Sequence, residues 1–225
     1  MLEQILRILS SLTTPQLVSV LLLPVLFAII VHEVAHGWVA KHLGDPTAER
    51  LGRLTLNPIK HIDPLGTILV PALLLLLRTG FVFGWAKPVP VTWSNLRHPK
   101  RDMAIVAAAG PAANLLMAVG WGLIARLGSL LSTQYGYIGQ PLVFMGLGGI
   151  FANVLLMAFN LLPLPPLDGG RVAVGLLPGP WAWRLSRLEP YGFFILIGLL
   201  YLGLLDSFIG IFRAILIGLI KTFLP

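Results

Sequence analysis

His32, Glu33 and His36 form an H-E-x-x-H sequence inside the apolar run from residue 17 to 40, where ionisable side chains are costly. On a helix the two histidines lie one turn apart on one face and can bind a single Zn²⁺, with Glu33 beside the metal to accept and return a proton. Two histidines satisfied inside an ordinary core helix are the alternative interpretation. Because three ionisable groups lie together in membrane-depth sequence, we predict a zinc site with one ion per chain.

The composition is that of an integral membrane protein. Of the 225 residues, 56% are hydrophobic and 11% are charged, and the mean hydropathy is +0.87, whereas about a quarter of the residues in soluble chains are charged. We expect one integral-membrane domain over residues 1–225. The net charge of +7 is spread over loops without an aromatic and basic stripe, which argues against nucleic acid as a partner. Because the chain has no Cys, imidazole and carboxylate are the available metal ligands.

Three long apolar runs predict membrane-spanning helices, so we expect an all-α polytopic bundle. Residues 1–14 lack a small-residue cleavage site and are expected to form a short interfacial helix. Residues 191–224 are apolar with charged interruptions, and predict either one long tilted helix or a short hairpin. The runs that predict the spans are residues 15–40, 103–131 and 141–162.

A fourth apolar region, residues 62–93, does not have the pattern of an ordinary membrane-spanning helix. Residues 62–77 are barely long enough to cross a bilayer, and residues 81–93 contain glycine and proline and alternate like an extended strand. Irregular backbone at membrane depth is tolerated only where it lines a cavity in the protein. We therefore predict a small membrane-associated β or re-entrant element near residues 50–93.

The distribution of basic residues predicts the orientation of the bundle. The segments 41–60, 87–101 and 171–187 contain 11 of the 16 Lys and Arg residues, and the positive-inside rule places them at the cytoplasmic face. The first and third long spans then both run inward, which brings His36 and Asp168 to the same side. We expect a multi-pass protein of the plasma membrane, with the zinc site nearer the cytoplasmic face and roughly 7 to 14 Å deep.

A catalytic zinc needs three protein ligands and an open position, so the two histidines require a third ligand. Asp168 is the best candidate, because it follows a span that the charge pattern directs toward the histidines. An Asp-Gly turn is the alternative interpretation of Asp168, but it does not explain why that turn ends a span among so many prolines. The other candidates lie off the ligand face of the helix, on the opposite side of the membrane, or in Asp-Pro turns; they are His42, Asp206, Asp45 and Asp63.

Two amides, Asn114 and Asn160, lie at a depth suitable for stabilising a developing oxyanion. Each is equally a candidate for hydrogen bonding between helices. We predict catalytic roles for Glu33, Asn114 and Asn160. His61 is expected to support a ligand or a turn, without a catalytic role.

Five motifs follow one another along most of the chain: HEVAH at 32–36, GRLTLNP at 52–58 with HIDPLG at 61–66, GWAKPVP at 84–90, GPAAN at 110–114 and NLLPLPPLDG at 160–169. In this order they resemble the site-2 protease family of intramembrane zinc metalloproteases. The resemblance implies zinc held by His32, His36 and Asp168, with Glu33 as the catalytic acid and base. It implies hydrolysis of a peptide bond within the transmembrane helix of a substrate.

The resemblance also implies β-structure at residues 81–93 that pairs with an unwound substrate strand. The chain length suits a compact form without the PDZ or nucleotide-sensing domain of larger relatives. The expected partners are the bilayer and a transmembrane substrate, and the oligomeric state stays open. A membrane metal transporter that uses the same His and Asp cluster is the alternative function, although we find no internal repeat and only one dense cluster.

Overall fold

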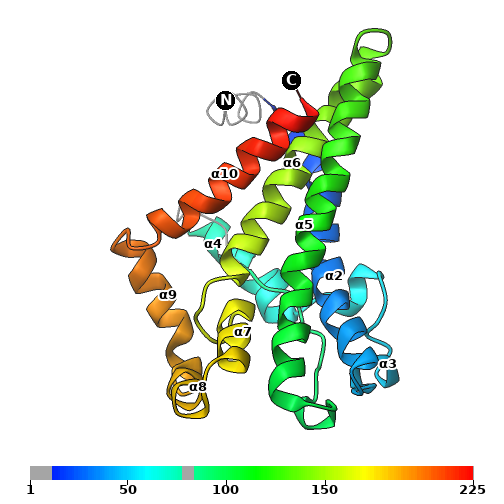
Figure 1. The fold of residues 1–225 in the computed structure, drawn as a ribbon. Helices are drawn as coiled ribbons and strands as arrows, with labels where there is room; N and C mark the ends of the chain where they lie inside the picture. Colours follow the sequence, from blue (N-terminus) through cyan, green and yellow to red (C-terminus); the bar gives the residue numbers. More distant parts are fainter. Residues whose placement is uncertain (1–11, 78–83, 225) are drawn as a thin grey trace.

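The computed structural model describes residues 12–77 and 84–224. Three of its helices are long and apolar enough to cross a membrane: α2 (Thr14–His42), α5 (Pro99–Ser132) and α6 (Gly136–Asn160). They lie side by side in alternating directions, and α5 packs against both of the others (Figure 1). These helices confirm the three predicted spans of an all-α membrane protein. The predicted interfacial helix at 1–14 falls almost wholly outside the described residues.

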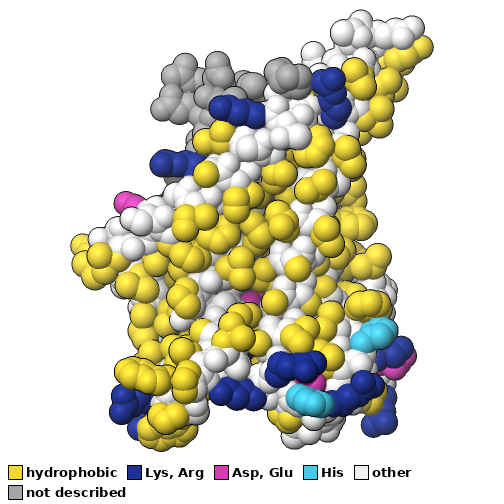
Figure 2. Space-filling view, in the orientation of Figure 1, with side chains coloured by type: hydrophobic (Ala, Val, Ile, Leu, Met, Phe, Trp, Pro, Cys, Tyr) yellow, Lys and Arg dark blue, Asp and Glu magenta, His cyan; other side chains and the backbone are white. Residues whose placement is uncertain are grey.

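The core of the bundle lies between α5, α6 and α10 (Asp206–Phe223). It contains small and large apolar side chains, namely Ala118, Trp121, Leu147, Ile150, Val154, Met157, Ala158, Phe212, Leu216 and Ile220. The face of the bundle in Figure 2 is largely apolar as well, and Leu22, Leu116 and Leu123 of the spans are each more than half exposed. An apolar exterior of this extent suits contact with lipid rather than with water.

After α6 the chain turns through residues 161–167 into four short helices before α10. They are α7 (Asp168–Leu176), α8 (Gly179–Ser186), η4 (Glu189–Tyr191) and α9 (Gly192–Tyr201). Residues 191–224 do not form the single long helix, because α9 and α10 are separate helices that meet at an angle (Figure 1). Gly203 in the turn between them has a φ of +67°, a conformation that interrupts a continuous helix.

The segment between α2 and α5 is made of short pieces. In order they are α3 (Thr47–Arg50), η1 (Pro58–His61), η2 (Pro64–Leu69), α4 (Val70–Leu76) and η3 (Trp93–Asn95). The chain from 84 to 92 is extended, but none of its described residues belongs to a strand. The predicted β-structure near residues 50–93 is therefore not found there, and residues 78–83 lie outside the described part of the chain.

The hydrogen bonds of the extended segment explain why residues 84–92 do not join a sheet in the described part of the chain. The amides of Trp85, Lys87 and Val89 point to one side, as expected for alternate residues of an extended chain. They donate to the Gly66 carbonyl at 3.0 Å, the His61 carbonyl at 2.9 Å and a carboxylate oxygen of α2 at 2.8 Å. These acceptors belong to two short helices and a side chain, whereas a sheet requires a second extended segment.

Asp45 fixes the far end of this segment against the end of α2. Its carboxylate is fully buried and accepts hydrogen bonds from the Thr92 amide at 2.7 Å, the Asn95 amide group at 2.9 Å and Thr47. Burial by itself would raise the pKa of Asp45, but these hydrogen bonds outweigh it and hold the pKa below its ordinary value. Asp45 thus forms the expected turn and in addition anchors the loop that leads into α5.

Candidate metal centre

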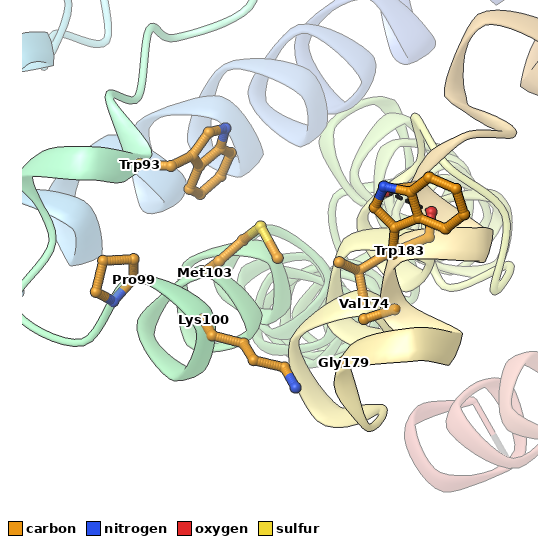
Figure 3. A pocket seen from close by; sticks show the side chains of 9 residues that line it. Trp93, Pro99, Lys100, Met103, Val174, Gly179 and Trp183 are labelled. Carbon is orange, nitrogen blue, oxygen red and sulfur yellow. Dashed lines mark hydrogen bonds between the residues drawn. The ribbon is translucent and has the colours of Figure 1, made fainter.

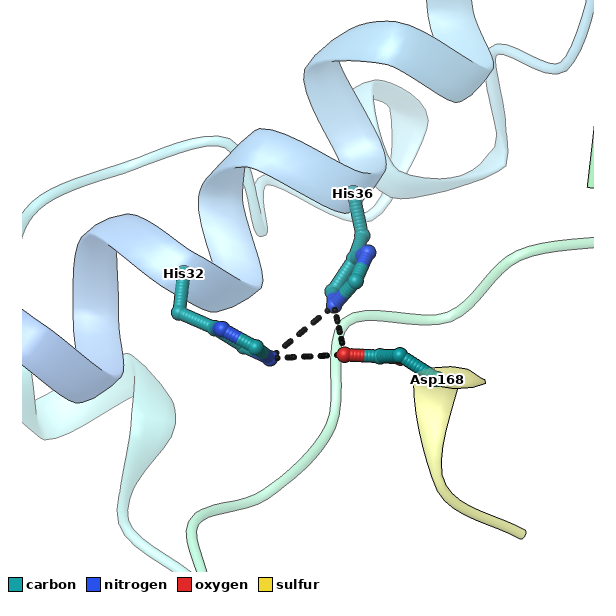
Figure 4. Close-up of side chains that lie close together, drawn as sticks. All are labelled: His32, His36 and Asp168. Atoms are coloured by element: carbon teal, nitrogen blue, oxygen red, sulfur yellow. Dashed lines mark hydrogen bonds and ion pairs between the residues drawn. The ribbon is translucent and has the colours of Figure 1, made fainter. Parts of the chain in front are cut away.

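The described chain brings His32, His36 and Asp168 together (Figure 4). The two histidines lie one turn apart on α2, and Asp168 is the first residue of α7. The Nε2 atoms are 3.1 Å apart, and the Asp168 Oδ2 atom lies 3.1 Å from the first and 3.3 Å from the second. Both histidines are buried, and the aspartate side chain is 14% exposed. Three potential ligand atoms therefore converge on one point inside the bundle.

The hydrogen bonds at the two Nδ1 atoms determine which nitrogen of each imidazole carries the proton. His32 Nδ1 lies 2.6 Å from the side-chain oxygen of Asn114, and His36 Nδ1 lies 2.8 Å from the Val106 carbonyl oxygen. Since both partners are acceptors, each Nδ1 carries the proton and each Nε2 presents a lone pair. Asp168 Oδ2 is a third acceptor, and it is buried without a hydrogen-bond donor among the described residues. Three converging lone pairs repel one another unless a cation lies between them.

Asn114 holds His32 through a network that joins the three spans. Its amide nitrogen donates to the Ala28 carbonyl of α2 at 3.1 Å and to the Asn153 side-chain oxygen of α6 at 2.9 Å. Asn153 in turn donates to the Gly149 carbonyl at 2.8 Å. Both asparagines are fully buried. The donor capacity of Asn114 is thus used within the bundle, and its oxygen orients a histidine.

The approach of α5 to the histidines depends on Gly110. A Cβ atom at this position would lie 2.4 Å from His36 Nε2 and 2.6 Å from His32 Cε1. No real side-chain carbon tolerates such distances, so only glycine lets the α5 backbone face the imidazoles. The same close approach allows the Val106 carbonyl, one turn earlier, to accept from His36.

Asp168 reaches the cluster because α6 ends before it. The helix stops at Asn160, and three prolines in the following segment, Pro163, Pro165 and Pro166, prevent it from continuing. The chain then reverses and starts α7 at Asp168, with the carboxylate directed toward α2 (Figure 4). The proline-rich end of the span, which an Asp-Gly turn alone did not explain, accounts for this placement.

Glu33 is held beside the cluster by the extended segment. Its Oε2 accepts from the Val89 amide at 2.8 Å. The two residues before Val89 are held as well: the buried guanidinium of Arg53 donates to the Lys87 carbonyl at 2.8 Å and to the Pro88 carbonyl at 3.3 Å. Arg53 thus fixes the segment that holds Glu33. The other carboxylate oxygen of Glu33 has no hydrogen-bond partner among the described residues.

The remaining candidates lie elsewhere. Asn160 donates to the Leu156 carbonyl of its own helix at 3.0 Å, and no described contact joins it to the cluster. His61 is buried and its Nε2 contacts the Thr55 carbonyl oxygen at 2.8 Å. Asp63 caps η2 through the Leu65 and Gly66 amides. The side chains of His42 and Asp206 are exposed, and neither belongs to the described metal-binding group.

Sequence reasoning missed Asn153, Arg53, and the roles of Gly110 and the Val106 carbonyl. Two of these have visible signals in the sequence: Asn153 is an amide in the middle of an apolar span, and Arg53 lies in the GRLTLNP motif. The partner of a backbone carbonyl has no sequence signal, because it depends on how two helices are set against each other.

Curated proteins similar to this chain are described as zinc metalloproteases. The protein named putative zinc metalloprotease YwhC, from Bacillus subtilis, is 38% identical over 199 residues, which cover 86% of this chain and 84% of that protein. The Rip2 protein of Mycolicibacterium smegmatis, described in the same words, is 31% identical over 175 residues, which cover 78% of this chain and 64% of that protein. Neither a family model nor a solved structure matches the chain.

The three candidate spans, the buried cluster of two histidines and one carboxylate, and these relatives together place the chain in the class of membrane metalloproteases. Within that class, the chain belongs to the site-2 protease family of zinc metalloproteases.

The donor atoms fit zinc. Ligand atoms around a tetrahedral zinc with bonds of about 2.0 to 2.1 Å lie about 3.3 Å from one another. The three separations in the cluster are 3.1, 3.1 and 3.3 Å. Nitrogen and oxygen donors of this kind, with three from the protein, are typical of catalytic zinc sites.

Proposed function

We propose that this protein is an intramembrane endopeptidase of the H-E-x-x-H type, which hydrolyses a peptide bond in the transmembrane segment of a membrane protein. In this proposal His32, His36 and Asp168 hold the zinc and Glu33 is the catalytic acid and base. The observation that carries it is the convergence of three lone pairs from α2 and α7, with both histidine tautomers set by hydrogen bonds. The relatives described as zinc metalloproteases support the reaction class.

Glu33 performs the proton transfers. When bound, zinc supplies Lewis-acid chemistry that acidifies a water molecule and polarises the scissile carbonyl. The Glu33 oxygen not bonded to Val89 accepts the proton of the attacking water and then returns it to the leaving amine. The Val89 hydrogen bond keeps the carboxylate in place during both transfers, so that little reorganisation is needed.

The substrate is an unwound stretch of a transmembrane helix. Residues 84–92 support this proposal because they are extended, largely exposed at 84, 85, 87 and 88, and joined directly to Glu33 through Val89. A substrate strand laid beside this segment gains main-chain hydrogen bonds that replace some of those of its helix. It also passes beside the carboxylate that assists the cut.

Two variants test the assigned roles in the purified full-length protein. Glu33→Gln is expected to keep zinc at the wild-type level and to lose cleavage of a single-span model substrate. Asp168→Ala is expected to lose both, because a third ligand is missing. Metal analysis and the cleavage assay give the two readings. Asp206→Ala, which removes an exposed carboxylate outside the metal-binding group, is the control and should change neither.

Two outcomes would contradict the proposal. Cleavage retained by Glu33→Gln would refute the role of that carboxylate. Uptake of zinc into vesicles by a protein that cuts no substrate would favour the metal transporter instead.

A further inference from the structure

Helix α8 presents a surface that the proposed reaction does not use. Trp181 and Trp183 are 59% and 60% exposed, and Arg184 and Arg187 are exposed beside them. We call these four residues the α8 surface. The helix is held to the protein on its other side, where Ala182 is buried. It lies at the end of the bundle where α2 ends and α5 begins, the end at which many basic side chains gather (Figures 1 and 2).

The arginines of the α8 surface are arranged to bind an anion. Arg184 lies over the Trp181 ring at 5.2 Å and Arg187 over the Trp183 ring at 4.9 Å, so each guanidinium stacks on an aromatic face. Stacking leaves the N–H edge of a guanidinium free to bind a phosphate. Within residues 12–77 and 84–224, no acidic side chain forms an ion pair with either arginine. The sequence from 171 to 187 contains three arginines and no acidic residue.

An apolar groove of about 320 Å³ opens next to this surface, between the start of α5 and the α7 and α8 pair (Figure 3). Trp93, Met103, Val174 and Trp183 give it hydrocarbon walls. Lys100 lies at its edge and donates to the Leu177 carbonyl, so that α5 is tied to the end of α7. The groove and the arginines together offer apolar and cationic contacts side by side.

We propose that the α8 surface and the adjoining groove bind an anionic phospholipid of the bilayer. The phosphate contacts Arg184 and Arg187, and part of an acyl chain enters the groove. Charge complementarity favours an anion, and the exposed tryptophans favour the bilayer interface, where an amphipathic ring contacts both headgroups and chains. An acidic protein segment would use the arginines but would leave the apolar groove and the tryptophans in water.

The test uses the full-length protein in phosphatidylcholine vesicles that contain phosphatidylglycerol. Two samples are compared: in one the phosphatidylglycerol is brominated, and in the other an equal mole fraction of the phosphatidylcholine is brominated. Quenching of tryptophan emission reports how close the brominated lipid lies. The emission of the Trp181→Phe/Trp183→Phe variant is subtracted to isolate the α8 surface. Brominated phosphatidylglycerol is expected to quench more strongly than brominated phosphatidylcholine. Arg184→Gln/Arg187→Gln should reduce this preference by about fivefold for each arginine removed.

Matched variants separate charge from folding. Arg184→Lys/Arg187→Lys keeps the charge and should keep most of the preference, and Arg126→Gln/Arg213→Gln removes two exposed arginines elsewhere and should leave it unchanged. Equal quenching by the two lipids in the wild type, or an undiminished preference in Arg184→Gln/Arg187→Gln, would overturn the proposal. Because quenching requires neither zinc nor cleavage, its outcome is independent of the proposed protease function.

Discussion

The hydrogen bonds at the two histidine Nδ1 atoms determine the chemistry of the cluster. An Nδ1 that donates to a carbonyl oxygen fixes the tautomer, directs Nε2 inward and increases its basicity toward a metal. His32 relies on a side chain, Asn114, whereas His36 relies on the backbone of α5 at Val106. The first support can be removed by mutation, and the second can be disturbed only by moving the helix.

Gly110→Ala is expected to lower zinc affinity at least about tenfold, because the new Cβ would lie 2.4 Å from His36 Nε2 and would push α5 away from α2. Competition with a fluorescent zinc chelator measures the affinity. Gly120→Ala is the matched control on the same helix, since a Cβ there meets nothing within 4 Å. Zinc binding that Gly110→Ala leaves intact would show that the helices can separate without disturbing the site.

Asn114→Ala is expected to weaken zinc binding by about 10- to 100-fold, since His32 loses the acceptor that sets its tautomer. The same chelator competition measures this change. Asn160→Ala should bind zinc normally, because Asn160 bonds only within its own helix in the described contacts. If Asn160 donates to the oxyanion, its variant should lose about 10² to 10³ in kcat, and an unchanged kcat would exclude that role.

At the scale of elements, the extended segment 84–92 connects the buried guanidinium of Arg53 to the proposed catalytic carboxylate of Glu33. Arg53 holds its carbonyls at Lys87 and Pro88, and its amide at Val89 holds Glu33. The segment is therefore positioned from both sides without belonging to a sheet. Its geometry depends on contacts from α2 and from the loop after α3.

Arg53→Gln is expected to reduce kcat by about 10- to 100-fold while zinc content stays at the wild-type level, because a shift of about 1 Å in the segment misplaces Glu33. Zinc analysis and steady-state kinetics on a single-span substrate separate the two effects. Arg53→Lys, which retains a buried donor, should recover part of the rate, and Arg50→Gln, an exposed neighbour, should match the wild type. Equal loss of zinc and rate in Arg53→Gln would indicate a general folding defect.

The sequence patterns predicted the spans, because a helix of this kind depends mainly on the residues of its own segment. Apolar runs located α2, α5 and α6, and the charge pattern brought Asp168 to the histidines. The alternation in residues 81–93 predicted β-structure, but a sheet also requires a partner, and the available acceptors belong to η1, η2 and Glu33. The contact between Asn114 and His32 depends on the relative depth of two helices, which no single-sequence pattern specifies.

At the scale of the whole molecule, the orientation in the bilayer is a proposal that rests on the basic end of the bundle. The chain contains no Cys, so single cysteines can be introduced as reporters. Arg50 lies in α3 at the proposed cytoplasmic end, and Gln134 lies in the exposed turn between α5 and α6 at the other end.

In intact cells, a membrane-impermeant maleimide is expected to label Gln134→Cys and to leave Arg50→Cys unlabelled until the membrane is permeabilised. The positive-inside rule is the physical reason for this difference. Comparison of labelling before and after permeabilisation gives the measurement, with the Cys-free protein as the blank. Labelling in the reverse order would place the cluster on the opposite side.

The cluster joins residues made early and late during synthesis. The histidines of α2 emerge first, Asn114 follows on α5, and the carboxylate at Asp168 is added only after α6 is complete. On the proposed ligand set, a nascent chain therefore lacks a complete centre until Asp168 has been added. On that ligand set, the chain is expected to cut nothing while α2 and α5 are being inserted.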